Sequence, residues 1–236
     1  GFTPPPLDPP AINIPHPWTR SVNGVCFLES PAGHSFGPFE GHLIGCEYDT
    51  RRLVRMTLQK IGDQFQGAVY PLSREAAPDS LSFLGPVSCA VSPRGELYIG
   101  SMKDSGWGAG NNVGEVIQLK FDPASLPAGI AEVEAVGPDS LAIQLHGDIA
   151  AAAGDASNYR IESYTRVSTP AYGGPDQHRR RETIEKVEFD AAQRRATLKL
   201  APLRPGFVYE IHVDRKLAQR GDFFPAEAHF TFHAAP

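Results

Sequence analysis

Short runs with apolar side chains at alternate positions recur along the chain, separated by glycine and proline. The alternation is clear over residues 195–200 and 208–213. A period of two places these side chains on one face of an extended strand. The 236 residues include 23 glycines and 22 prolines, which fall between the strand-like runs and mark turns. The pattern therefore predicts an all-β protein.

The first half contains a weak internal repeat of these runs. Residues 23–28, 41–45 and 52–58 resemble, in the same order, residues 85–91, 95–100 and 114–120. The first unit adds a fourth run at residues 66–72. Units of about four antiparallel strands are typical of β-propeller blades. An ordinary antiparallel meander would give similar runs, but order and punctuation repeat together, which favours an incomplete propeller of about two blades.

The second half predicts seven short strands at near-even spacing. They fall near residues 131–136, 140–146, 158–166, 182–189, 195–201, 207–214 and 227–234. Such spacing is typical of an immunoglobulin/fibronectin-like β-sandwich. No cysteine lies in this half, so the disulfide of antibody domains is absent.

Proline-rich stretches set the expected boundaries. Residues 1–20 are expected to form a Pro-rich extended lead, and residues 21–121 the propeller blades. Residues 122–130, which include Pro123 and Pro127, are expected to be a linker before a β-sandwich domain at 131–236. This organisation predicts two independently packed β-domains.

The charge pattern weighs against nucleic acid as a partner. The net charge is −5, and the one basic run, residues 178–181, is followed at once by Glu182. We interpret that run as a solvated loop. No stretch approaches the roughly 20 apolar residues that cross a bilayer, so no membrane span is expected.

The three cysteines, Cys26, Cys46 and Cys89, lie in strand-like runs. No Cys-x-x-Cys is present, so a zinc ribbon or a covalently attached c-type haem is not supported. Buried free thiols are the simpler interpretation, and a disulfide is the alternative.

Several segments resemble the late blades of glucose/sorbosone dehydrogenase-like propellers. They are residues 36–45, 52–56, 65–68, 92–100 and 105–108. The resemblance extends over roughly residues 20–235. The sequence is similar to large secreted proteins, common in planctomycete-like bacteria, that join such a propeller to a C-terminal sandwich and often to a cytochrome. The resemblance implies a secreted or periplasmic protein.

Soluble members of that family oxidise sugars with pyrroloquinoline quinone (PQQ) and calcium. The resemblance transfers poorly to their cofactor site, because Tyr48 or Asp49 stands where the family has a cofactor-contacting lysine. Residues 84–89 lack the arginines and the aspartate that the family places at the last inner strand. The family's general-base histidine lies in an early blade that this sequence does not contain. PQQ and calcium therefore remain candidate cofactors without an assigned site.

Candidate ligand-binding residues lie in the loops, because propeller sites are built from loops at one end of the central channel. Trp107 could stack on a sugar or quinone ring, or it could fill space between blades. Asp104, Asn111 and Asn112 offer oxygen ligands for calcium, but they lack EF-hand spacing and turn formation explains them equally. The candidate ligand-binding residues are His34, Tyr48, Asp49, Asp104, Trp107, Asn111 and Asn112. No catalytic residue and no metal site is assigned.

Two functions remain open. The first is a degenerate dehydrogenase-like propeller segment that binds carbohydrate or a partner protein, or serves as a structural assembly module. The alternative is part of an active PQQ- and calcium-dependent sugar dehydrogenase whose catalytic histidine lies on blades absent from this chain. Two blades cannot bury both of their outer faces. We therefore expect the chain to associate with remaining blades, from the same polypeptide before cleavage or from other copies.

Overall fold

The protein is all-β, as the sequence predicts, in a computed structural model that describes residues 8–74, 83–103, 112–166 and 174–236. Within these ranges the helical segments are short 3₁₀ turns, and all neighbouring named strands pair antiparallel. The same residues include no helix with the length and apolar character needed to span a bilayer.

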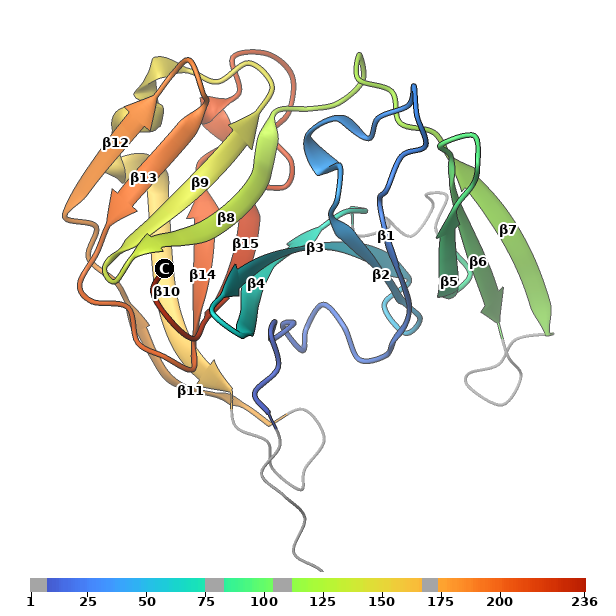
Figure 1. The fold of residues 1–236 in the computed structure, drawn as a ribbon, viewed down its shortest axis with the longest axis horizontal. Helices are drawn as coiled ribbons and strands as arrows, with labels where there is room; N and C mark the ends of the chain where they lie inside the picture. The colour runs from blue at the N-terminus through green and yellow to red at the C-terminus, as the bar shows by residue number, and fades with distance from the viewer. Residues whose placement is uncertain (1–7, 75–82, 104–111, 167–173) are drawn as a thin grey trace, which may run out of the picture.

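The strands of the first half form two consecutive meanders (Figure 1). The first meander comprises β1 (Val22–Phe27), β2 (Leu43–Glu47), β3 (Arg52–Ile61) and β4 (Gln64–Pro71). The second comprises β5 (Pro86–Val91), β6 (Leu97–Lys103) and β7 (Val113–Leu119). These are the repeated runs of the sequence, so each predicted run in this half is a strand.

The described residues of the second half form eight strands, one more than predicted. They are β8 (Gly129–Gly137), β9 (Ser140–His146), β10 (Tyr159–Arg166), β11 (Asp176–Arg181), β12 (Lys186–Asp190), β13 (Arg195–Lys199), β14 (Phe207–Val213) and β15 (Glu227–Phe232). The additional strand is β11, which contains the basic run interpreted as a solvated loop. The run is not a loop, because its backbone pairs with β10. Its side chains are exposed to solvent, as expected.

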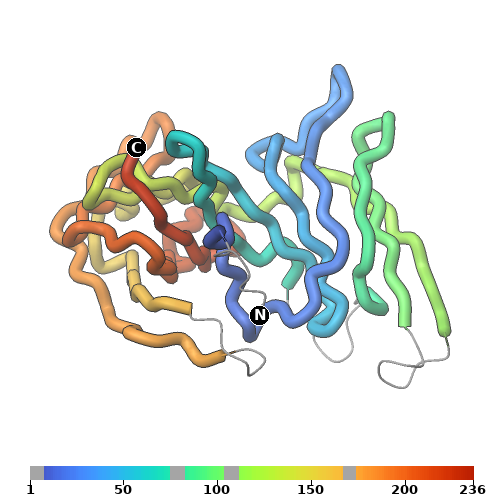
Figure 2. Tube along the Cα trace, turned by 60° about the horizontal axis from the view of Figure 1, so that its bottom comes forward, coloured from blue at the N-terminus to red at the C-terminus, as the bar shows by residue number. Residues whose placement is uncertain are grey.

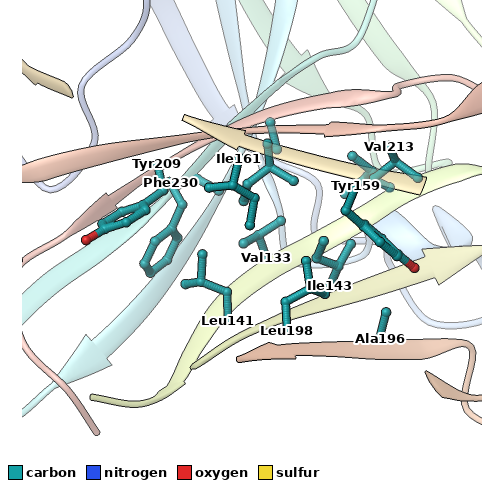
Figure 3. Close-up of a cluster of buried hydrophobic side chains, with 14 of the residues drawn as sticks. Val133, Leu141, Ile143, Tyr159, Ile161, Ala196, Leu198, Tyr209, Val213 and Phe230 are labelled. Carbon is teal, nitrogen blue, oxygen red and sulfur yellow. The ribbon is translucent and has the colours of Figure 1, made fainter. Parts of the chain in front are cut away.

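The core of the second half lies between two sheets (Figure 3). Leu141 and Leu198 project from β9 and β13, and Ile161 and Phe230 face them from β10 and β15. All four side chains are fully buried. Burying a side chain of this size stabilises the fold by about 1.5–3 kcal/mol. The alternation in the sequence therefore corresponds to the inward faces of a two-layer sandwich.

One sheet runs across the boundary that the sequence places at residues 122–130. Strand β4 pairs with β15, with Ala68 opposite Phe230. The resulting sheet has eight strands in the order β1-β2-β3-β4-β15-β14-β10-β11. Ala68 and Tyr70 of β4 are part of the same core as Phe230, and β8 already begins at Gly129. The expected linker therefore separates strands that share a sheet and a core.

The described part of the Pro-rich lead covers one face of the first meander. Ile12, Ile14 and Trp18 pack against a small buried cluster that includes Val54 and Val69. The buried carboxylate of Glu47 holds the end of the lead, since it accepts hydrogen bonds from the backbone N–H groups of Arg20 and Ser21 at 2.7 and 2.8 Å.

The second meander packs against the opposite face of the first, at the end of the molecule remote from the sandwich (Figure 2). Their shared cluster includes Ile44 and Leu53 from the first meander and Ile99 from the second. The backbones of β1 and β5 approach closely, because a Cβ placed on Gly24 would lie 2.6 Å from the Cα of Ser88. The two meanders are therefore stacked face to face.

The three cysteines meet at this stack. Cys89 reaches across to the first meander, where its thiol lies 3.9 Å from the carbonyl oxygen of Ile44. The Cys26 and Cys46 thiols lie near it, and these neighbouring thiols together with burial raise the pKa of Cys89 to about 12. All three thiols are free, but only Cys46 is fully buried, whereas Cys26 and Cys89 are half-buried. The predicted free thiols are therefore present, and their burial is less complete than expected.

A buried arginine joins the first meander to the sandwich. Arg55 of β3 is fully buried, and its guanidinium donates hydrogen bonds to the carbonyl oxygens of Ile130 and Ala131 in β8. The guanidinium carbon lies 4.4 Å from the ring centroid of Phe39 and 4.2 Å from that of Tyr70. Backbone dipoles and aromatic faces thus replace the water around this cation.

Replacing this residue tests how firmly the two halves are joined. Arg55→Ala should lower the free energy of unfolding by about 3 kcal/mol or more, because it removes a large buried side chain and two hydrogen bonds. Arg55→Met, which keeps most of the volume, should cost less. Guanidinium-induced unfolding monitored by circular dichroism measures both values. The exposed Arg94→Ala is the control, and an Arg55→Ala loss as small as that of the control would contradict the assignment.

Candidate functional site

The candidate ligand-binding residues do not gather at one place. Antiparallel pairing places the start of β1 and the end of β2 together, so Tyr48 and Asp49 lie at that end of the stacked meanders. Asn112, which directly precedes β7, lies at the same end, because Val113 is opposite Lys103 and the Tyr48 ring lies beside Gly85 and Met102 at that end of the second meander. His34 lies at the other end, against Gly95 in the turn between β5 and β6. His34 therefore cannot share a binding site with the other three.

Asp104, Trp107 and Asn111 lie outside the described residues. Their proposed stacking and calcium-binding roles stay predictions. Asn112 is described, and it is exposed with a positive φ of 47°, a conformation that asparagine tolerates in turns.

Tyr48 and Asp49 are engaged with the protein itself. The Tyr48 ring lies over Gly85, where an added Cβ would be 2.7 Å from the ring. The Asp49 carboxylate is 3.5 Å from the guanidinium of Arg20, in an exposed ion pair. Neither side chain forms the cationic cradle that an anionic quinone cofactor would need.

A cleft that the sequence did not predict lies where the first meander, the linker and the sandwich meet. It has a volume of about 810 Å³. Its lining includes Leu72 and Arg74 from the segment after β4, residues 123–128 of the linker, and Arg220 and Asp222 from the segment before β15. No sequence motif could reveal it, because these three segments are far apart along the chain.

The cleft combines apolar surface with charged groups at its edge. Arg74 is ion-paired with Asp222, and its guanidinium lies 4.6 Å from the ring centroid of Phe224. The hydrogen bond from Arg74, with that from the Phe223 N–H, lowers the pKa of Asp222 and keeps this carboxylate ionised. Asp148 and Arg220 add two further exposed charges.

A second hollow of about 330 Å³ adjoins the cleft. Arg74 and Phe224 line both hollows, and Trp18 and Glu227 line the second. The two hollows therefore present aromatic rings beside hydrogen-bonding and ionic groups, a combination that suits a polar ligand with an apolar face.

Two histidines lie beside the buried Arg55. Nδ1 of His42 is 2.8 Å from its guanidinium, and His146 packs edge-on against Phe39 with ring centroids 5.3 Å apart. Burial, and then the charge of Arg55, lowers the pKa of His42 to about 3 and that of His146 to about 4. Neither ring nitrogen of His146 has a hydrogen-bond partner among the described residues. Both imidazoles are therefore neutral near pH 7.

Comparisons with known proteins give little further guidance. No family model matches the sequence, and no curated protein matches it. Among solved structures, the crystal structure of the S-layer protein rSbsC(31-844) is similar to part of the chain, with 19% sequence identity and a TM-score of 0.33. The similar region covers 47% of this chain and 14% of that one. A TM-score this low does not establish a shared fold.

The lowered histidine pKa values predict that the protein loses stability in mild acid. In the unfolded chain a histidine has a pKa of about 6.5. As the pH falls from about 6.5 toward 4, the unfolded chain binds protons that the folded protein excludes. Each histidine should then lower the free energy of unfolding by up to about 1.4 kcal/mol per pH unit.

Chemical unfolding at pH 7, 6, 5 and 4.5 measures this slope. His146→Leu should reduce it by roughly the share of one histidine, whereas the exposed His178→Asn should leave it unchanged. Equal slopes for His146→Leu and the unmodified protein would show that His146 is protonated in the folded state.

Proposed function

We propose that the protein is a structural assembly module, in which two blades of a degenerate dehydrogenase-like propeller are joined to an immunoglobulin/fibronectin-like sandwich. In this proposal the exposed outer face of the β5–β7 meander receives a further β-meander of the same kind. The partner is a unit like those already stacked in this chain.

The stacking of the two meanders supports the propeller part of the proposal. In a propeller each blade packs against a neighbour on both of its faces. Here β5–β7 packs on β1–β4 through one face, in the chain order that the sequence repeat predicts. Cys26 and Cys89, which are equivalent positions of that repeat, meet at the stack.

The strand order supports the sandwich part. Sheets ordered β8-β9-β13-β12 and β15-β14-β10-β11 correspond to strands A-B-E-D and G-F-C-C′ of an immunoglobulin-type fold. In addition, the hydroxyl of Tyr209, in strand β14, accepts a hydrogen bond from the backbone N–H of Arg204 at 2.8 Å. This contact resembles the tyrosine corner of that fold.

The observation on which the assembly rests is the exposure of apolar side chains on the outer strands. Val116 of β7 is 75% exposed, and its cross-strand partner is Gly100, which has no side chain to cover it. On β1, Val25 and Phe27 are 56% and 47% exposed. The lead covers Val54 and Val69 but leaves these two side chains open to solvent. Both outer sides of the stack therefore keep apolar surface for a neighbouring unit.

The assembly predicts concentration-dependent association. Light scattering after size-exclusion chromatography should give masses above the 25.5 kDa of one chain. Val116→Asp should weaken the association at least about tenfold, because it places a charge in an apolar contact. Val136→Asp, at a 39% exposed valine of the sandwich, is the matched control. A protein that stays a soluble monomer at every concentration would contradict the assembly of copies.

Carbohydrate binding at the junction cleft is a second candidate function. The mixed lining of the cleft favours sugar binding. Phe224 provides an aromatic face, and hydrogen-bonding groups come from Arg74, Arg220, Asp148 and Asp222. Sugars present both an apolar ring face and a ring of hydroxyl groups, which suits such a surface.

Saturation-transfer NMR with cellotriose, maltotriose and a uronic-acid trisaccharide tests this candidate. Arg220→Ala should weaken binding of the bound sugar about tenfold, through loss of a charged hydrogen bond. Arg215→Ala, an exposed arginine outside the cleft lining, is the control. Absence of transfer to all three sugars would exclude these carbohydrates.

The sugar-dehydrogenase alternative has no observation that favours it. Tyr48 and Asp49, at the position of the family's cofactor lysine, do not fit an anionic quinone. Reduction of an electron-accepting dye with aldoses, after addition of PQQ and calcium to the protein, would overturn the degenerate-propeller proposal.

A further inference from the structure

Two Glu-x-His triplets lie side by side in the sandwich. They are Glu210-Ile211-His212 in β14 and Glu227-Ala228-His229 in β15. The antiparallel register places Glu210 opposite His229 and His212 opposite Glu227. The central Ile211 and Ala228 are fully buried in the core. Because side chains alternate along a strand, the two glutamates and two histidines share the opposite, outward face of the sheet.

The polar atoms of three of these side chains converge, and the fourth, that of His212, bonds to Glu210. Glu227 Oε1 lies 2.9 Å from His229 Nε2, and Glu210 Oε1 lies 2.6 Å from His212 Nε2. One ligand atom from each of Glu210, Glu227 and His229 lies within 4.8 Å of the other two. Two carboxylates and the His229 imidazole therefore surround one point between the strands, and His212 lies beside Glu210.

His229 is fixed in an orientation that allows its Nε2 atom to coordinate a metal ion. It is 3% exposed, with Trp18 packed edge-on at a centroid distance of 4.7 Å. Its Nδ1 is 3.0 Å from the hydroxyl of Tyr164, so its Nε2 faces the carboxylates. Metal-binding histidines in proteins commonly use the other ring nitrogen in such an orienting hydrogen bond.

Arg179 is the nearest competing cation. It lies 2.6 Å from Oε2 of Glu210, but it also pairs with Asp176 and Glu162 at 2.8 and 3.0 Å. Asp176 and Glu162 are also paired with Arg166 and Arg160, at 2.7 and 3.9 Å. Oε1 of Glu210 faces His212 instead, and Glu227 is hydrogen-bonded to His229. Arg179 thus engages Oε2 of Glu210 and leaves its Oε1 to the cluster.

We propose that Glu210, Glu227 and His229 bind one Zn²⁺ ion between β14 and β15. Imidazole and carboxylate are ligands that zinc accepts, at about 2.0–2.2 Å from the metal. Tetrahedral ligands at that distance stand about 3.3 Å apart. The three ligand atoms lie within 4.8 Å of one another, and Glu227 Oε1 is 2.9 Å from His229 Nε2, so small side-chain movements would bring them to that spacing. Zinc would replace the hydrogen bond between Glu227 and His229.

The site has access to solvent and a structural consequence. Glu227 lines the hollow beside Trp18, so an ion can reach the cluster from that side. Three protein ligands would leave the fourth position of a tetrahedral zinc site to water. The ion would cross-link β14 to β15, the strand that also pairs with β4. This inference is independent of the assembly proposed above.

Metal titration of the full chain tests the proposal. Isothermal titration with ZnCl₂, after removal of metals with a chelator, should give one Zn²⁺ per chain. At about 100 times the dissociation constant, zinc should raise Tm by about 5–10 °C. Cobalt(II), used as a spectroscopic probe, should show the visible absorption of tetrahedral coordination. Failure to bind zinc at one equivalent, or cobalt that stays octahedral, would overturn the site.

Variants separate this site from adventitious binding. Glu227→Gln should weaken zinc binding at least about tenfold, and its half-exposed position makes it compatible with folding. His229→Gln should abolish stoichiometric binding, with circular dichroism as the check that the chain folds. The exposed His178→Asn is the matched control and should bind zinc as the unmodified protein does. Equal affinities for Glu227→Gln and the control would contradict the proposal.

Discussion

The buried guanidinium of Arg55 is the interaction on which the arrangement of the two halves depends. A cation inside a protein is tolerated only where other groups replace its hydration. The carbonyl oxygens of Ile130 and Ala131 and the rings of Phe39 and Tyr70 do so here, and they come from both sides of the expected domain boundary. The charge can be accommodated only while β3 lies against β8. The first meander and the sandwich are therefore one packed unit at this junction.

Other features of the junction follow from that constraint. Pairing of β4 with β15 continues the sheet, and Tyr70 enters the sandwich core, where its hydroxyl accepts a hydrogen bond from the N–H of Val133. His42 and His146 are held neutral by burial and by the charge of Arg55. The junction cleft opens between the linker and the segment that precedes β15. Stability in mild acid thus depends on the residues that surround Arg55.

The two ends of the molecule offer different kinds of chemistry. At the stacked meanders, Val116 and Phe27 leave apolar surface exposed, which suits association with a further β-meander. On the outer face of the sandwich, Glu210, Glu227 and His229 form a compact set of oxygen and nitrogen ligands. The exposed apolar surface suits contact with another polypeptide, whereas the glutamate–histidine cluster offers ligand types that a single metal ion binds.

The sequence by itself determined the all-β class and the position of nearly every strand, because a period of two and glycine–proline turns are local properties. It missed β11, since an exposed edge strand such as residues 176–181 has no alternation of burial to detect. It also grouped His34 with Tyr48, although antiparallel pairing puts them at opposite ends. Only the tertiary structure decided that Ala68 lies beside Phe230, that Glu210 faces His229, and that the linker borders a cleft. These are long-range registers, and strand register is set by side-chain packing between segments distant in sequence, which no single segment encodes.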